Sequence, residues 1–146
     1  MANTSIYLNF PGNTEEAFTF YKSVFGGEFL GDGILRFGDV PPQEGAPAPP
    51  DEVKHMIMHM ELGLPGGLIL MGSDAPEPMG FKVTCGNNFY ITIEPDTRKE
   101  TKDFFDALAV GGKIETELQE MFWGAYYGVI IDKFSIQWMF NCMSKI

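Results

Sequence analysis

Hydrophobic positions near the N-terminus first follow the period of a strand and then that of a helix. In Ser5–Phe10 apolar and polar residues alternate, which predicts a β-strand with one buried face. Apolar residues at helical spacing follow, from a cap at Asn13 or Thr14 to Phe25. The pair Gly26-Gly27 ends this predicted helix.

The same succession recurs in the second half of the chain. A helix capped by Asp96 or Thr97 ends at Gly111-Gly112, and its apolar stripe includes Phe105 and Leu108. The other predicted strands are Glu28–Phe37, Lys54–Leu62, Leu68–Ser73, Asn88–Ile93, Lys113–Leu118, Gly124–Ile131 and Phe134–Asn141. The order β-α-β-β-β therefore occurs twice, which predicts a single α+β domain of two modules, 1–80 and 81–146. We expect a helix on the outer face of each four-stranded sheet, and a half-open trough formed by the other sheet faces.

A proline-rich segment interrupts the first module. The five prolines within Gly38–Pro50 exclude a helix or a central strand. We expect a surface loop there, either a lid or a disordered insertion.

Composition and charge narrow the class of partner. The 146 residues carry a formal net charge of −10 and no cluster of lysine and arginine, so we expect neither nucleic acid nor an anionic membrane as a partner. No apolar run approaches the roughly 18 residues of a membrane span, and the N-terminus lacks the pattern of a signal peptide. Cys85 and Cys142 form no CxxC pair, and we expect them to be free thiols in a reducing cytoplasm.

The richest aromatic stretch lies near the C-terminus. Met121–Phe140 contains two aromatic, β-branched runs on either side of a charged turn, which predicts a β-hairpin. Its large rings suit the wall of a ligand cavity, and they suit a core or a dimer interface equally well. The rings concerned belong to Trp123, Tyr126, Tyr127 and Trp138. Strand alternation allows at most one of the two tyrosines to face the trough.

Segments spread over nearly the whole chain match a known pattern. They are Tyr7–Ala17, Phe20–Gly27, His59–Leu62, Met71–Asp74, and Gly112–Ile114 through Gln119–Gly124 to Asp132–Phe134. These segments resemble the vicinal oxygen chelate superfamily, which includes glyoxalase I, bleomycin-resistance proteins and extradiol dioxygenases, and most closely its PhnB-like branch. The resemblance implies a paired βαβββ fold that is commonly assembled as a homodimer.

The residue types do not reproduce the metal site of this superfamily. Its metal-dependent members place His, Gln or Glu on the first and last strand of each module. Alignment through the turn at Pro11–Asn13 puts other residues there, namely Ile6, Leu70 or Met71, Phe89 or Tyr90, and Met139. We therefore expect no metal and no other cofactor. A two-histidine site of His55 and His59, with Glu61 beside it, stays open as an alternative.

His59 is the leading candidate for a polar ligand-binding group, because the resembling family carries a histidine at this point. It would reach into the trough and exchange a proton near neutral pH. The alternative is a histidine satisfied by a backbone carbonyl or by Glu61. No catalytic residue is identified, since Glu115, Glu117 and Glu120 are typical of a solvated acidic face.

Three hypotheses for the function follow. The first is a PhnB-like protein that binds a small hydrophobic or aromatic molecule without metal, through His59, Trp123, Tyr126 and Trp138. The second is a metal-dependent lyase, isomerase or dioxygenase with non-standard ligands that include His59. The third is a structural or interaction homodimer whose trough is filled by its own side chains.

Overall fold

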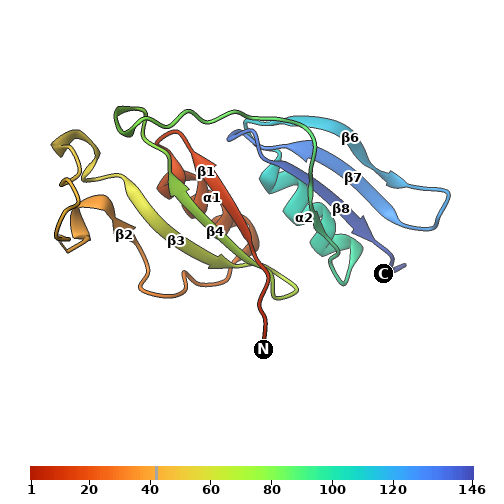
Figure 1. Ribbon diagram of the computed structural model, residues 1–146. Helices are drawn as coiled ribbons and strands as arrows, with labels where there is room; N and C mark the ends of the chain where they lie inside the picture. Colours follow the sequence, from red (N-terminus) through yellow and green to blue (C-terminus); the bar gives the residue numbers. More distant parts are fainter. Residues whose placement is uncertain (42) are drawn as a thin grey trace. The chain divides into compact units, whose positions relative to one another are not determined.

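Each half of the chain forms a four-stranded mixed sheet with one α-helix packed on one face (Figure 1). These features come from a computed structural model that describes residues 1–41 and 43–146, so Pro42 of the proline-rich segment lies outside the described residues. The chain divides into two compact units, Met1–Thr84 and Cys85–Ile146. The predicted α+β class is confirmed, and the two sheets are not closed into a barrel.

The first unit has the strand order β1-β4-β3-β2. Its elements are β1 (Ile6–Phe10), α1 (Thr14–Phe25), β2 (Leu35–Arg36), β3 (Ile57–Gly63) and β4 (Ile69–Asp74), with three short 3-10 turns at Phe37–Asp39, Asp51–Val53 and Glu77–Met79. Strand β1 pairs with β4 in parallel, and the other pairs are antiparallel.

The second unit repeats this topology with the strand order β5-β8-β7-β6. Its elements are β5 (Ile91–Ile93), α2 (Arg98–Leu108), β6 (Lys113–Glu120), β7 (Tyr126–Ile131) and β8 (Gln137–Cys142). Again the first strand of the unit pairs with the last in parallel. The predicted double βαβββ succession is therefore present. Among the described residues, neither α-helix is long and apolar enough to cross a membrane.

The second strand of the first unit is much shorter than predicted. Of Glu28–Phe37, only Leu35–Arg36 forms a strand, and Phe29 adds an isolated bridge to Leu62. Gly31 and Gly33 take positive φ angles of 63° and 76°, which turn the chain away from an extended path.

A glycine under a helical phenylalanine recurs in both units. A Cβ atom at Gly72 on β4 would lie 2.7 Å from the ring of Phe18 on α1. A Cβ at Gly128 on β7 would lie 2.6 Å from the ring of Phe105 on α2. Each glycine therefore admits an aromatic ring into the layer between helix and sheet, where both rings are buried.

The two helices are capped in different ways. Thr97 caps α2 as predicted, because its side chain accepts a hydrogen bond of 3.1 Å from the backbone N–H of Glu100. Asn13 precedes α1 but makes no side-chain cap bond. The cap comes instead from Asp74 at the end of β4, whose Oδ1 accepts from the Thr14 N–H at 3.0 Å. The predicted local cap of α1 is thus replaced by a carboxylate that is distant in sequence.

Candidate functional site

Strand β3 leaves its regular alternation near its start. Ile57 and Met60 are both buried although residues three apart on a regular strand face opposite sides. The pairing of β2 with β3 shifts register at the same place. Met58 and His59, which lie between the two buried residues, are therefore both directed away from the core. A bulge of this kind re-aims side chains, and here it leaves one apolar and one polar group outside the core at adjacent positions.

A polar cluster that includes His59 joins β1 and β3. The hydroxyl of Tyr7 lies 3.2 Å from Nδ1 of His59, and Nε2 of His59 lies 3.3 Å from Oε2 of Glu61. Tyr7 and Glu61 both pair with Met71 of β4, so they project from the same face of the sheet. The Tyr7 side chain is 49% exposed, so the cluster is open to a ligand.

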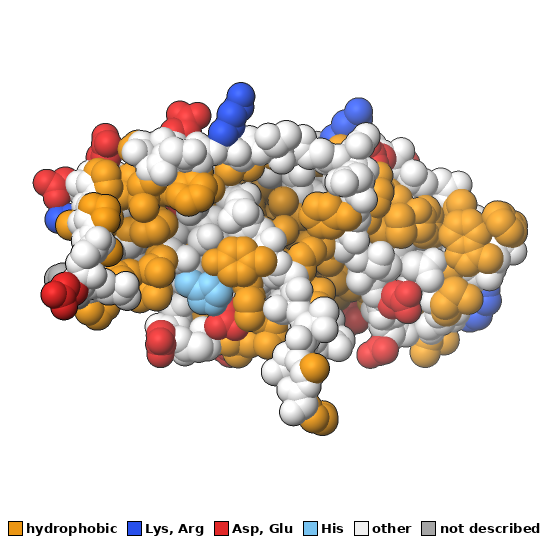
Figure 2. Space-filling model, viewed as in Figure 1, with side chains coloured by type: hydrophobic (Ala, Val, Ile, Leu, Met, Phe, Trp, Pro, Cys, Tyr) orange, Lys and Arg blue, Asp and Glu red, His pale blue; other side chains and the backbone are white. Residues whose placement is uncertain are grey.

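An apolar pocket of about 420 Å³ lies between Met58 and the proline-rich segment. Its lining is formed by Phe37, Val40, Pro47, Ala48, Pro49, Pro50, Met58, Pro78 and Met79. A second hollow of about 420 Å³ shares six of these residues and adds Lys54, which pairs with Asp51 at 2.7 Å. This size is typical of small-molecule pockets, about 300–1,000 Å³. In Figure 2 hydrophobic side chains (orange) gather near a histidine side chain (pale blue).

The proline-rich segment therefore forms one side of a pocket. Proline fixes its own φ angle, so a wall built from Pro47, Pro49 and Pro50 loses little conformational freedom when a ligand binds. Met58 and Met79 are unbranched and polarizable, which lets them fit ligands of different outline. The sequence predicted the loop, but it identified neither Met58 and Met79 as lining residues nor Tyr7 as a partner of His59.

The four aromatic rings of the predicted hairpin do not form one wall. Trp138 is completely buried, and its Nε1 donates a hydrogen bond of 2.9 Å to Oδ2 of Asp132. This position corresponds to the core alternative and excludes contact with an external ligand in this structure. Tyr126 lies on the side of the sheet that faces α2, where the Arg98 guanidinium is 5.2 Å from its ring centroid.

The other two rings lie together on the remaining side of the second sheet. Trp123 and Tyr127 meet edge to face with their centroids 5.3 Å apart, and Trp123 Nε1 donates to Oδ1 of Asn141 at 3.1 Å. Alternation along β7 thus selects Tyr127 and not Tyr126 as the partner of Trp123. The Tyr90 hydroxyl donates to Glu115 at 3.3 Å, and this bond joins the two edge regions of the sheet.

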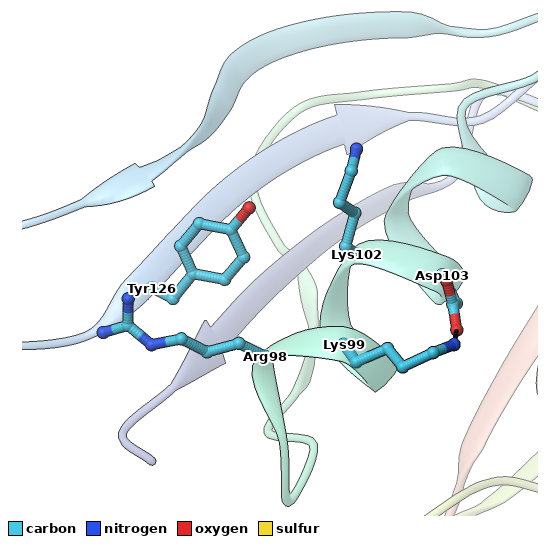
Figure 3. A pocket seen from close by; sticks show the side chains of 5 residues that line it. All are labelled: Arg98, Lys99, Lys102, Asp103 and Tyr126. Atoms are coloured by element: carbon cyan, nitrogen blue, oxygen red, sulfur yellow. Dashed lines mark hydrogen bonds and ion pairs between the residues drawn. The ribbon is translucent and has the colours of Figure 1, made fainter. Parts of the chain in front are cut away.

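Tyr126 lines a different hollow, of about 380 Å³, beside the first turns of α2 (Figure 3). The other lining residues are Arg98, Lys99, Lys102 and Asp103. Each cation already has an acidic partner: Arg98 pairs with Glu120, Lys99 with Asp103 at 2.7 Å, and Lys102 with Asp106 at 2.8 Å. These pairs neutralise the positive charges, so the hollow is not an anion site.

The strongest of these pairs predicts a displaced titration. Arg98, through its hydrogen bonds, and Lys145 lower the pKa of Glu120 from its ordinary value of 4.5 to about 2. Because the folded-state pKa is depressed, the contribution of this pair to stability is present above about pH 4.5 and is lost as the pH falls towards 2. We expect Arg98→Gln to raise the pKa of Glu120 towards 4.5 in a carboxyl NMR titration. Lys99→Gln, which removes only the partner of Asp103, should leave Glu120 unchanged; equal titrations in both variants would contradict this assignment.

The remaining candidates from the sequence lie apart from the polar cluster. His55 precedes β3 and is exposed, and its carbonyl accepts from Arg36 Nη1 at 2.7 Å. The predicted strand Lys54–Leu62 begins later than predicted, at Ile57, so His55 lies just before β3 and His59 within it. Cys85 is an exposed free thiol and Cys142 a buried one. Within 1–41 and 43–146, no three or more His, Cys, Asp or Glu side chains are grouped so that they could hold a metal ion.

Comparison with known proteins gives two relatives of similar identity. No protein-family model matches the chain. Protein YjdN of Escherichia coli strain K12 is 34% identical over 146 residues, which span 97% of this chain and 95% of YjdN. The crystal structure of protein PA1353 from Pseudomonas aeruginosa is 34% identical with a TM-score of 0.80, over 96% of this chain and 98% of that one.

More distant solved structures share the fold. A PhnB protein from Bacillus cereus is 23% identical with a TM-score of 0.74, over 97% of this chain and 99% of that one. A glyoxalase/bleomycin resistance protein/dioxygenase family enzyme from Burkholderia phytofirmans PsJN is 17% identical with a TM-score of 0.63, over 94% of this chain and 97% of that one. At these identities the likeness is one of architecture.

Proposed function

Because the chain belongs to the vicinal oxygen chelate superfamily, and within it to the PhnB-like branch, we propose that it binds a small hydrophobic or partly aromatic molecule without metal. One observation carries this proposal. The bulge in β3 directs Met58, which lines the apolar pocket, and His59, which belongs to the polar cluster, away from the core at adjacent positions.

The two parts of the site suit two parts of one ligand. A hydrocarbon or aromatic body that enters the pocket removes apolar surface from water, which contributes about 25 cal/mol per Å². A polar group on the same molecule would reach the half-exposed hydroxyl of Tyr7. A few polar contacts next to a mostly apolar lining are the usual composition of a small-molecule site.

Metal independence is part of the proposal, and the residue chemistry supports it. The cluster offers one imidazole and one carboxylate, from His59 and Glu61, and a phenol from Tyr7. A catalytic zinc site needs three protein ligands from His, Cys, Asp or Glu as a rule, and the cluster offers only two of these, so its donor set does not fit. Stoichiometric metal in protein purified without chelator, lost on His59→Ala, would replace this proposal by the metal-dependent hypothesis.

The proposal is tested by calorimetry with a panel of alkylbenzenes, alkylphenols and their methyl ethers. Met58→Asp places a charge against the pocket, and we expect it to weaken binding about tenfold or more, because an unpaired charge is costly to desolvate. Met143→Asp is the matched control, since Met143 is 55% exposed in the other unit. No binding by the unaltered protein, or equal binding by both variants, would refute the proposal.

Assembly as a homodimer belongs to the same proposal and rests on the resemblance. The exposed aromatic pair Phe122 and Trp123, which are 96% and 41% exposed, is a surface that such an interface would cover. Light scattering that gives the mass of a monomer at high protein concentration would remove this part of the proposal.

A further inference from the structure

We infer that the polar cluster selects ligands whose polar group is a hydrogen-bond donor, namely a hydroxyl or an amine on a hydrophobic body. This inference rests on the proposed function, because it names the chemistry of the ligand at the same site. It follows from the contacts that the imidazole ring of His59 makes with Glu61 and with Tyr7.

Glu61 determines which nitrogen of His59 carries the proton. A neutral imidazole has one N–H donor and one acceptor, whereas an ionised carboxylate can only accept. Oε2 of Glu61 lies 3.3 Å from Nε2 of His59, and at this distance the negative oxygen attracts a proton on Nε2 and repels a lone pair there. The Nε2–H tautomer is therefore favoured, and Nδ1 is left as an acceptor.

The tautomer of His59 in turn determines what Tyr7 can offer. The Tyr7 hydroxyl lies 3.2 Å from Nδ1 and has a single proton, which it must donate to that nitrogen. The phenolic oxygen then retains only lone pairs for any further partner. Since the Tyr7 side chain is 49% exposed, these lone pairs are what the cluster presents to a ligand. A ligand hydroxyl or amine satisfies them, whereas an ether or carbonyl oxygen would be repelled.

The test compares para-propylphenol with its methyl ether, para-propylanisole, by calorimetry on the full chain. We expect the phenol to bind about five- to tenfold more tightly, a difference that corresponds to one hydrogen bond. Tyr7→Phe should remove this preference while the ether still binds. Glu61→Gln should reduce it, because an amide no longer fixes the tautomer.

The outcomes separate this inference from the proposed function. Equal binding of phenol and ether, with both still weakened by Met58→Asp, overturns the inference that the cluster selects hydrogen-bond donors and leaves the proposed binding function intact. A preference that survives Tyr7→Phe likewise overturns it. If neither probe binds the unaltered protein, the proposed function is overturned, and so is the inference that the cluster selects hydrogen-bond donors. Circular dichroism melts of each variant establish that the folded state is being compared.

Discussion

Replacement of Asp74 by alanine is expected to lower the free energy of unfolding by about 3–4 kcal/mol. The carboxylate is 5% exposed and accepts three hydrogen bonds: from the N–H of Thr14 at 3.0 Å, from its hydroxyl at 2.6 Å, and from the N–H of Ile57 at 2.8 Å. Alanine would leave two buried backbone donors without an acceptor at the start of α1 and the start of β3. Each such loss costs about 1–3 kcal/mol.

Two further variants make this prediction specific. Asp74→Asn keeps one acceptor oxygen, so it should fall between alanine and the unaltered protein in urea unfolding. Asp32→Ala changes an exposed carboxylate and should shift stability by about 0.5 kcal/mol or less. If Asp74→Ala unfolds at the same urea concentration as Asp32→Ala, Asp74 does not join helix and strand in the way described.

Asp74 also marks the limit of what the sequence could predict about the fold. The two helices and the double βαβββ order were predicted from local signals. These signals are the period of the hydrophobic positions, the Gly-Gly pairs that end the helices, and the turn residues. The cap of α1 is not local, because its acceptor lies 60 residues away on β4. A pattern read along the chain has no means to assign such a bond, and Asn13 was the nearest suitable residue.

In the candidate site too, some features could be predicted from the sequence and others depend on tertiary structure. His59 was singled out from the resemblance, and its contact with Glu61 matches the alternative that this carboxylate satisfies it. Its contact with Tyr7 depends on β1 and β3 both flanking β4, which is tertiary information. Met58 was not identified as a lining residue, because a pattern along the chain does not locate the bulge in β3 that turns this side chain out of the core.

The side of the sheet on which each aromatic ring of the hairpin lies could not be predicted, for a related reason. Composition showed that rings were concentrated there, but the face of each ring depends on the register of β7 and β8. The register places Trp138 opposite Ile130 and Ile91, both buried, and Tyr126 opposite Cys142, also buried. Trp138 therefore lies in the core of the second unit, and Tyr126 lies on the α2 side of the sheet, where it lines the hollow shown in Figure 3.

Replacement of Asp132 by alanine should be the other large destabilisation, about 3 kcal/mol or more. Asp132 is 3% exposed, and it accepts from the N–H groups of Phe134 at 2.7 Å and Ile136 at 3.0 Å, and from Trp138 Nε1 at 2.9 Å. These bonds hold a tight turn in which Ser135 has a φ of 70°. That left-handed conformation costs a residue with a side chain about 1–2 kcal/mol, so the turn depends on its acceptor.

Trp138→Phe then separates a core role from a ligand-binding role for this hairpin. Phenylalanine removes the bond to Asp132 and leaves unfilled volume at a completely buried position, so we expect a loss of about 2 kcal/mol in urea unfolding. The affinity for para-propylphenol should stay unchanged at a temperature where the variant is folded, because Trp138 does not reach the surface. Asp96→Ala, at an exposed position in the same unit, is the control for stability. A variant that keeps its stability but no longer binds para-propylphenol would show that Trp138 contacts the ligand. The hairpin would then be part of the binding site.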